Sequence, residues 1–306
     1  MSSETKYEIN ADVCYDSRHR VGEITTLREY LYKRFSNQIT LLLESKRPRK
    51  TFSTKGKVST RKLYQYPFND SIFTQTSSVP SSDTTLVMLI DASSSMESNA
   101  FHMFGNDYSC MEVSTAISSA FAKAVRECVS DEIKIEVFLK TCSNQKVKGS
   151  LGLEGAPVEL IRVYSNTKRK DCDLDKMLTA TTNSPLQRTD YGSGGSATPE
   201  FAVLPALFNW ITDNVTTKNI CIFNITDGDT YSSVGHQSFG NADTRIMREK
   251  YLRHVNNITL YIGREIENKD KEIYGDNIVG NSTGDSTSFI QPMFNTLMKI
   301  FNSTTE

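Results

Sequence analysis

The sequence predicts an α/β protein: a doubly wound, mostly parallel sheet flanked by helices, preceded by a small helical and basic N-terminal extension. Short apolar runs, most clearly Leu86–Ile90 and Asn219–Ile225, alternate with helical patterns beyond residue 85, as is typical of buried parallel strands. Both runs lead into an aspartate, Asp91 and Asp227, where binding sites form in such sheets. We expect the 306 residues to divide into an extension, 1–80, and a domain, 81–306.

The extension differs from the rest of the chain in charge. Residues 1–80 carry a formal charge of +6 and the remainder −7. Apolar residues near helical spacing predict a helix over Arg28–Glu44. The stretch Ser45–Lys62 that follows holds eight basic residues and no acidic one. It fits either a solvated linker or a docking surface for an acidic partner or polyanion.

Further elements of the domain follow in order along the chain. A helix is expected over Met111–Val129, because its apolar positions share one face. Ile133–Leu139 alternates apolar and polar residues, which predicts a half-exposed strand near an edge of the sheet. Val158–Tyr164 is a further expected strand, and Asp173–Thr181 a short helix.

A glycine-rich loop, Tyr191–Ser196, leads into the next helix. Thr198 is a natural N-cap, and Pro199 suits the first helical position. Pro205 conflicts with the helix that follows and favours a kink. The C-terminal part of the chain predicts a helix, a short strand and a closing helix over Asp243–Val255, Ile258–Ile262 and Phe289–Phe301.

Composition excludes several classes of protein. No run of 18 apolar residues predicts a membrane span, and the N-terminus lacks the apolar core of a signal peptide, so we expect a cytoplasmic protein. The six cysteines form no CxxC pair, which disfavours zinc, and Cys128 and Cys221 fit small buried hydrophobes. No phosphate-cradle motif is present, and the net charge of −1 argues against a dominant nucleic-acid role.

The candidate site combines three loops. Asp91, Ser93 and Ser95 follow one core strand, Thr198 begins a helix, and Asp227 follows a second core strand. Their carboxylate and hydroxyl oxygens are the hard ligands that Mg²⁺ and Mn²⁺ take. We therefore predict a divalent-cation site at which these loops meet. Asp229 and Glu97 are expected to be solvated loop charges.

Such a site favours binding over hydrolysis. Hydroxyls are neutral ligands, so the ion stays poorly neutralised and would accept a carboxylate from outside. A hydrolase needs a positioned base or nucleophile, and none of the four histidines lies beside a motif. The sequence therefore describes a receptor for an acidic side chain better than a catalytic centre.

These residues carry a family resemblance. The stretch Asp91–Ser95, DASSS, resembles the D-x-S-x-S motif of the von Willebrand factor A (VWA) domain and its metal-ion-dependent adhesion site, MIDAS. The loop before Thr198 and the triplet Thr226-Asp227-Gly228 resemble that family's second and third loops. The resemblance implies a Rossmann-like fold over about residues 85–305. It implies that Ser93, Ser95 and Thr198 coordinate the ion, with Ser196 a rival to Thr198. By the same resemblance, Asp91 and Asp227 contact the ion directly or through water.

The preceding segment narrows the resemblance. GKVSTRKLYQYPFNDSIF, beginning at Gly56, is similar to the intracellular CobT-type cobaltochelatase subunit, although that family's long acidic segment is absent. The resemblance implies a non-catalytic, Mg²⁺-dependent adaptor that links a AAA+ ATPase of the MoxR or CobS type to a client protein bearing an acidic residue. It is compatible with a monomer or an oligomer. Two alternatives remain: a metal-dependent hydrolase using Asp227, or a nucleic-acid-binding protein using residues 45–62.

Overall fold

The computed structural model describes the following residues: 6–8, 21–45, 50–53, 57–58, 73–76, 84–97, 99–128, 133–142, 158–166, 200–217, 219–228, 232–234, 237–239, 241–253, 255–262, 265–275 and 277–280. Their centre is a seven-stranded sheet in the order β1-β9-β8-β5-β10-β13-β14. These strands are β1 (Lys6–Glu8), β9 (Val158–Ser165), β8 (Ile133–Cys142), β5 (Thr84–Asp91), β10 (Asn219–Thr226), β13 (Asn256–Tyr261) and β14 (Ile278–Gly280).

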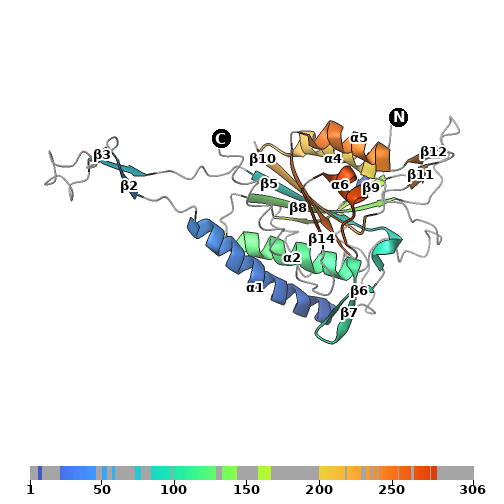
Figure 1. The fold of residues 1–306 in the computed structure, drawn as a ribbon, viewed down its shortest axis with the longest axis horizontal. Coiled ribbons are helices and arrows are strands. Elements are labelled where there is room, and N and C mark those ends of the chain that lie inside the picture. Colours follow the sequence, from blue (N-terminus) through green and yellow to red (C-terminus); the bar gives the residue numbers. More distant parts are fainter. Residues whose placement is uncertain are drawn as a thin grey trace.

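The sheet is mostly parallel, as the sequence predicts. Five of its six strand pairs are parallel, and β8 and β9 form the antiparallel pair. Helices cover both faces, so the predicted α/β class with helix-flanked strands is confirmed. The helices are α1 (Val21–Ser45), α2 (Cys110–Cys128), α4 (Glu200–Asn214), α5 (Asn241–Leu252) and α6 (Asn268–Tyr274). Figure 1 shows α1 and α2 below the sheet and α4 and α5 above it.

Side chains alternate along each strand, so the hydrophobic core is divided between the two faces of the sheet. In β5, Leu86, Met88 and Ile90 belong to the cluster that contains α1 and α2. Val87 and Leu89 belong to the cluster with α4 and the end of α5. Because side chains alternate across a strand, an unbroken apolar run is what burial on both faces requires. All eight residues of β5 are buried.

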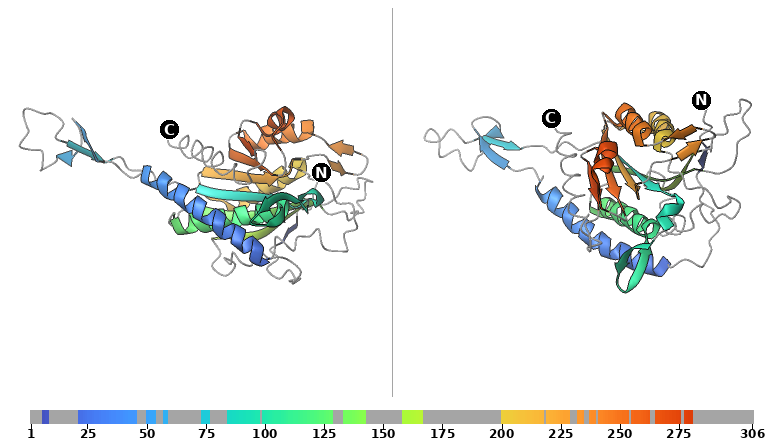
Figure 2. Two further views of the ribbon diagram at one scale, coloured as in Figure 1. Left: turned by 60° about the horizontal axis from the view of Figure 1, so that its bottom comes forward. Right: turned by 45° about the vertical axis from the view of Figure 1, so that its right-hand side comes forward.

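Helix α2 is enclosed between the sheet and α1 (Figure 2). Fourteen of its 19 residues are buried, and many are small, which lets the neighbouring backbones approach closely. Helix α1 begins at Val21, seven residues before the predicted start, and buries five apolar residues against α2 and its surroundings, at helical spacing: Ile24, Leu27, Leu31, Phe35 and Ile39. Each such side chain contributes about 1.5–3 kcal/mol by leaving water.

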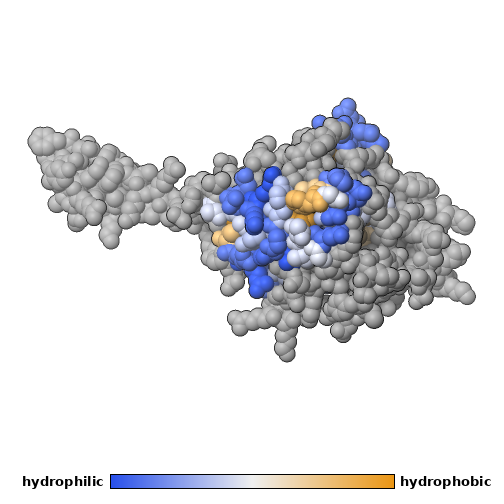
Figure 3. Space-filling model, turned by 90° about the horizontal axis from the view of Figure 1, so that it is seen from below, coloured by the Kyte–Doolittle hydropathy of each residue, from blue (hydrophilic) through white to orange (hydrophobic). Residues whose placement is uncertain are grey.

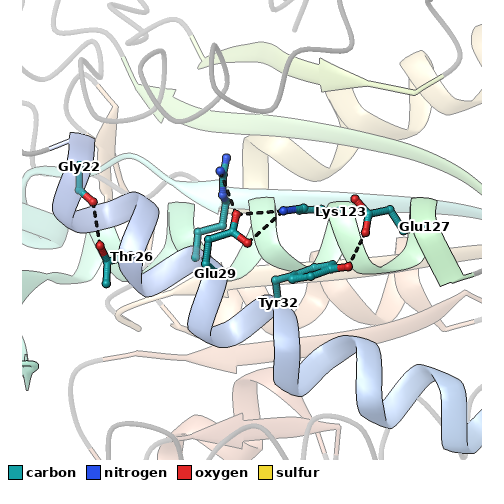
Figure 4. A network of polar contacts seen from close by, with 7 residues as sticks. Gly22, Thr26, Glu29, Tyr32, Lys123 and Glu127 are labelled. Atoms are coloured by element: carbon teal, nitrogen blue, oxygen red, sulfur yellow. Dashed lines mark hydrogen bonds and ion pairs between the residues drawn. The ribbon is translucent and has the colours of Figure 1, made fainter.

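A polar seam runs beside this apolar contact (Figure 4). Lys123 donates hydrogen bonds of 2.9 and 3.0 Å to the carboxylate of Glu29 and lies 4.3 Å from the ring centre of Tyr32. Burial acts to raise the pKa of Glu29, but Lys123 and Arg28 outweigh it and hold the pKa below its usual value. The Tyr32 hydroxyl donates to Glu127, which raises the pKa of Tyr32. Viewed from below, where α1 lies, the described surface is mainly hydrophilic with small apolar patches (Figure 3).

Three smaller sheets accompany the main one. The order β2-β4-β3 joins β2 (Lys50–Ser53), β4 (Phe73–Thr76) and β3 (Lys57–Val58), so part of the predicted basic stretch is strand. Figure 1 shows β2 and β3 apart from the main sheet, beyond the end of α1. The hairpins β6–β7 (Asn99–Met103, Asn106–Ser109) and β11–β12 (Ser232–Val234, Gln237–Phe239) are the other two, and a 3-10 turn, η2 (Ser94–Glu97), follows β5.

The predicted edge position of Ile133–Leu139 is wrong. This segment lies in β8, between β9 and β5, and residues 135–140 are all buried. Lys134, near its start, is half-buried, whereas Glu136 faces the α4 side and is paired there rather than solvated. Glu136 accepts a 2.8 Å hydrogen bond from Ser165 and lies 3.7 Å from the Arg162 guanidinium. Alternation of polar residues therefore reflects internal pairing here, not exposure.

Most other predicted elements are present with shifted ends. Helix α4 contains Pro205, and helix α5 and strand β13 begin two residues earlier than expected. Cys221 is buried in β10, and burial raises the pKa of its thiol to about 12. The segments Asp173–Thr181, Tyr191–Ser196 and Phe289–Phe301 lie outside the described residues. Among the described helices, none combines the length and apolarity that crossing a bilayer requires.

Candidate metal centre

Strand register brings the two predicted loops together. Strands β5 and β10 are parallel neighbours, with Ile90 opposite Ile225. Their carboxyl ends therefore lie at one edge of the sheet, where Asp91 ends β5 and Thr226 ends β10. The Thr226 hydroxyl donates a 2.8 Å hydrogen bond to Oδ2 of Asp91, across the strand boundary. Asp91 itself is 1% exposed.

The loop after β5 folds back on the same carboxylate. The backbone N–H of Ser93 donates to Oδ1 of Asp91 at 2.9 Å. A hydrogen bond from the Met96 N–H to the Ser93 carbonyl closes the turn into η2. This turn places the hydroxyl oxygens of Ser93 and Ser95 2.9 Å apart. Ser93 is buried and Ser95 exposed, so the pair leads from the carboxylate towards solvent.

A glycine fixes the turn that carries Asp227. Gly228 has φ +106° and donates its N–H to the Thr226 hydroxyl at 3.2 Å. A Cβ at Gly228 would lie 1.9 Å from the hydroxyl oxygen of Tyr261, a fully buried side chain. The turn is therefore packed directly on β13. Asp227 is half-buried, and its Oδ1 atom is shielded from solvent.

Lys140 is a further component of this edge. It lies opposite Asp91 in the register of β8 and β5, and its Nζ is 3.6 Å from Oδ2 of Asp91. The Lys140 side chain is 0% exposed and that of Asp91 1%. A charge this deep is stable only when paired, because taking it out of water is costly. The Asp91 carboxylate thus accepts hydrogen bonds from Ser93 and Thr226 and forms an ion pair with Lys140.

The structure thus places four of the five predicted site residues. Asp91, Ser93 and Ser95 form one hydrogen-bonded set, and Asp227 directly follows Thr226, which joins that set. Thr198 and its rival Ser196, like Asp229, lie outside the described residues, and the Glu97 side chain does too.

Sequence reasoning missed the roles of Thr226 and Lys140. Thr226 could have been found, because it precedes Asp227 at the end of a core strand. Lys140 could not, because its position opposite Asp91 depends on the register of two strands about fifty residues apart.

The side chains at this edge offer the oxygen ligands that a hard divalent cation prefers. Ser93 and Ser95 offer two adjacent hydroxyl oxygens beside the Asp91 carboxylate, and Asp227 follows Thr226 in the adjoining loop; Mg²⁺ and Mn²⁺ prefer oxygen ligands of these kinds. Such an ion would supply a positive charge able to attract an acidic group. Within the described residues no group of three or more His, Cys, Asp or Glu side chains gathers to hold a metal. A site of this kind would depend on hydroxyls and water instead.

A separate cavity lies at the opposite edge of the sheet. It has a volume of about 450 Å³ between α5, α6 and the start of β13, with Arg248 and Asn257 in its lining. Arg248 is nearly buried and donates hydrogen bonds to Asn257 and Thr259, of 3.3 and 3.1 Å. Glu249 and Glu272 also line this cavity, so their carboxylates offset part of the positive charge of its arginines. It is no part of the candidate metal centre.

Comparisons with known proteins identify no family. Neither a family model nor a curated protein matches the chain. Among solved structures, the pilus adhesin SpaC from Lactobacillus rhamnosus GG, in its open conformation, is similar with a TM-score of 0.41 and 10% identity, over 72% of this chain and 30% of that one. A second SpaC structure gives 0.42 and 12%, with the same coverage. The PilB minor pilin from Streptococcus sanguinis gives 0.41 and 11%, over 73% and 60%. Likenesses this distant carry no argument about function.

Proposed function

We propose that the chain is a divalent-cation-dependent protein-binding module of the VWA type, with its ion, Mg²⁺ or Mn²⁺, at the carboxyl edge of the sheet. One observation carries the proposal. The hydroxyl of Thr226 contacts Asp91 at 2.8 Å, so the two loops with the predicted ligands share one centre. Ser93 and Ser95 would hold the ion, with Asp91 and Asp227 acting through water or directly, and Thr198 as a further ligand.

The chemistry of these donors favours capture of an acidic side chain. Two neutral hydroxyls leave most of an ion's charge unbalanced, and the exposed Ser95 keeps the centre accessible to a partner. A carboxylate from a client would complete the coordination. By the same proposal the module acts inside the cell as the adaptor of a AAA+ ATPase of the CobT-associated type, without chemistry of its own.

The first experiment measures the ion directly. Mn²⁺ titration followed by electron paramagnetic resonance should show one saturable site, competed by Mg²⁺. Replacing both hydroxyls, Ser93→Ala with Ser95→Ala, should weaken binding about tenfold or more, since the loss even of groups behind the ligands costs about 10–100-fold in metal affinity. The matched control replaces two buried serines of α2, Ser118→Ala with Ser119→Ala, and should bind Mn²⁺ normally. Equal affinity in both double variants would contradict the proposal.

Alanine at Asp91 is a poor test of the same proposal. It would leave the buried Lys140 ammonium without this carboxylate, which costs about 3–5 kcal/mol and threatens the fold. The serine variants remove ion ligands without touching that pair. Co-purification from the native cell, with and without EDTA, then asks whether a AAA+ ATPase and an acidic client are retained only with the cation.

The two alternatives receive no specific support. A hydrolase would need a base beside the ion; of the histidines in the described part of the chain, His102 lies on the exposed β6–β7 hairpin, bonded to Asp107 at 2.7 Å. Nucleic-acid binding would use the stretch Ser45–Lys62, whose side chains lie outside the described set. Turnover of generic phosphoesters would favour the hydrolase. Nucleic-acid affinity that falls steeply with salt would favour the nucleic-acid-binding protein.

A further inference from the structure

Lys140 is an unusual occupant of a cation-binding edge. Its ammonium is completely buried and lies 3.6 Å from Oδ2 of Asp91, a carboxylate that also accepts hydrogen bonds from Ser93 and Thr226. A lysine at this depth has one charge to contribute and no access to solvent or to a client. Its effect on the site is therefore electrostatic, exerted through Asp91.

The charge balance of the edge follows from this placement. Among the described residues of the centre, the charged groups are Asp91, Asp227 and Lys140, so the formal charge is −1 rather than −2. With Lys140 present, Asp91 has a buried counter-charge even without an ion. An arriving divalent cation instead meets the fixed positive charge of Lys140, which lies behind Asp91 in the buried interior, where repulsion is less screened than in water.

We propose that Lys140 sets the ion affinity of this centre: it stabilises the ion-free state, weakens binding of the ion alone, and makes the ion bind firmly only together with a carboxylate. The inference rests on the proposed function. The acidic group of the client supplies the negative charge that Lys140 has cancelled, so ion and client bind cooperatively. Lys140 acts as a positioning and charge-balancing residue and contacts neither of them.

The test compares Mn²⁺ affinity in three full-length proteins by titration. Lys140→Met should bind Mn²⁺ about tenfold or more tightly than the parent, because the nearby positive charge is gone. Lys134→Met is the matched control, since Lys134 lies on the same strand and the same face, roughly 20 Å away. It should bind like the parent.

Thermal unfolding gives a second readout, because a bound ion raises the melting temperature by an amount that grows with its affinity. In EDTA, Lys140→Met should melt below the parent, because Asp91 has lost its counter-charge. Saturating Mn²⁺ should raise the melting temperature of Lys140→Met more than that of the parent. If Lys140→Met does not fold, Lys140→Gln keeps a polar group of similar length without the charge and serves in its place.

Acetate serves as the probe carboxylate, with acetamide as its uncharged control. At constant ionic strength, acetate should tighten Mn²⁺ binding in the parent and do so less in Lys140→Met. Equal Mn²⁺ affinity and equal acetate response in the two proteins would overturn the role of Lys140 while leaving the metal centre in place. If neither protein binds Mn²⁺, with or without acetate, the proposed function fails and this inference falls with it.

Discussion

At the scale of single residues, the loop that carries Asp227 depends on the absence of a side chain next to it. Gly228 combines a backbone conformation with φ +106° and direct contact with the ring of Tyr261. Tyr261 is fully buried and its hydroxyl donates to Asp270 at 3.4 Å, so it cannot move aside cheaply. The position of Asp227 is therefore set from β13 as well as from β10.

We predict that Gly228→Ala lowers the free energy of unfolding by about 2–4 kcal/mol, the sum of backbone strain and overpacking. Chemical denaturation measures it. Gly105→Ala separates the two causes, because Gly105 also has positive φ, +77°, but a Cβ there meets nothing within 4 Å. It should lose only about 1–2 kcal/mol. Equal losses in the two variants would show that contact with Tyr261 contributes nothing. Gly228→Ala should also weaken Mn²⁺ binding, and Gly105→Ala should not.

Single residues also show where sequence reasoning about the site reached its limit. The motif Asp91–Ser95 and the triplet at Thr226 could be recognised because each is local and follows an apolar strand. Lys140 directly follows the predicted strand Ile133–Leu139 and belongs to no motif of its own. Its role depends on lying opposite Asp91, and register is a property of two strands together.

At the scale of elements, helices α1 and α2 are joined by an ion pair beside their apolar contact. Glu29 accepts two hydrogen bonds from Lys123, and Lys123 also lies over the ring of Tyr32. The pKa of Glu29 is held below its usual value of 4.5. A depressed pKa means that the folded state favours the ionised carboxylate more than the unfolded chain does. The resulting stability is complete above pH 4.5 and disappears as the pH falls through the lower, folded-state pKa.

We predict that Glu29→Gln destabilises the protein by less than about 1 kcal/mol at pH 7, because the side chain is partly exposed and water screens the pair. The gap between Glu29→Gln and the parent should narrow as the pH falls below 4.5 and close in stronger acid. Urea denaturation at a series of pH values measures this. Glu249→Gln removes a carboxylate from a much more exposed, 3.9 Å pair on α5 and should change little at pH 7. A gap that widens in acid would contradict the assignment.

At the scale of the whole molecule, the sequence predicts helices on both faces of a parallel sheet. It does not predict the position of each strand within that sheet. Apolar runs such as Leu86–Ile90 indicate burial on both faces, and this is enough to predict helices on either side of a parallel sheet. An edge position is predicted for Ile133–Leu139 because polar residues such as Lys134 and Glu136 alternate with apolar ones. The partners of Glu136 and of the neighbouring Lys140, which are Ser165, Arg162 and Asp91, belong to other strands, so no local pattern contains them.

The predicted boundary at residue 80 separates α1 from the domain, whereas α1 shares a hydrophobic core with α2 and the sheet. Its buried residues belong to the same cluster as Met88 and Phe223, and Phe35 packs edge-on against Phe121 at 5.6 Å. A chain without α1 would expose the outer side of α2, a contiguous surface that water disfavours. The helix is therefore expected to contribute to the stability of everything that follows it.

We predict that a protein comprising residues 81–306 loses cooperative unfolding or precipitates, although it retains all the predicted metal ligands. Thermal melting followed by circular dichroism, with a dye that binds exposed apolar surface, measures both effects. Leu31→Ala in the full chain isolates the helix contact from the rest of the deletion and should cost about 2–5 kcal/mol. Thr40→Ala, at an exposed position of the same helix, should change stability by less than about 0.5 kcal/mol. If residues 81–306 melt cooperatively within a few degrees of the full chain, and Leu31→Ala is as mild as Thr40→Ala, then α1 is dispensable and the boundary at residue 80 is the physical one.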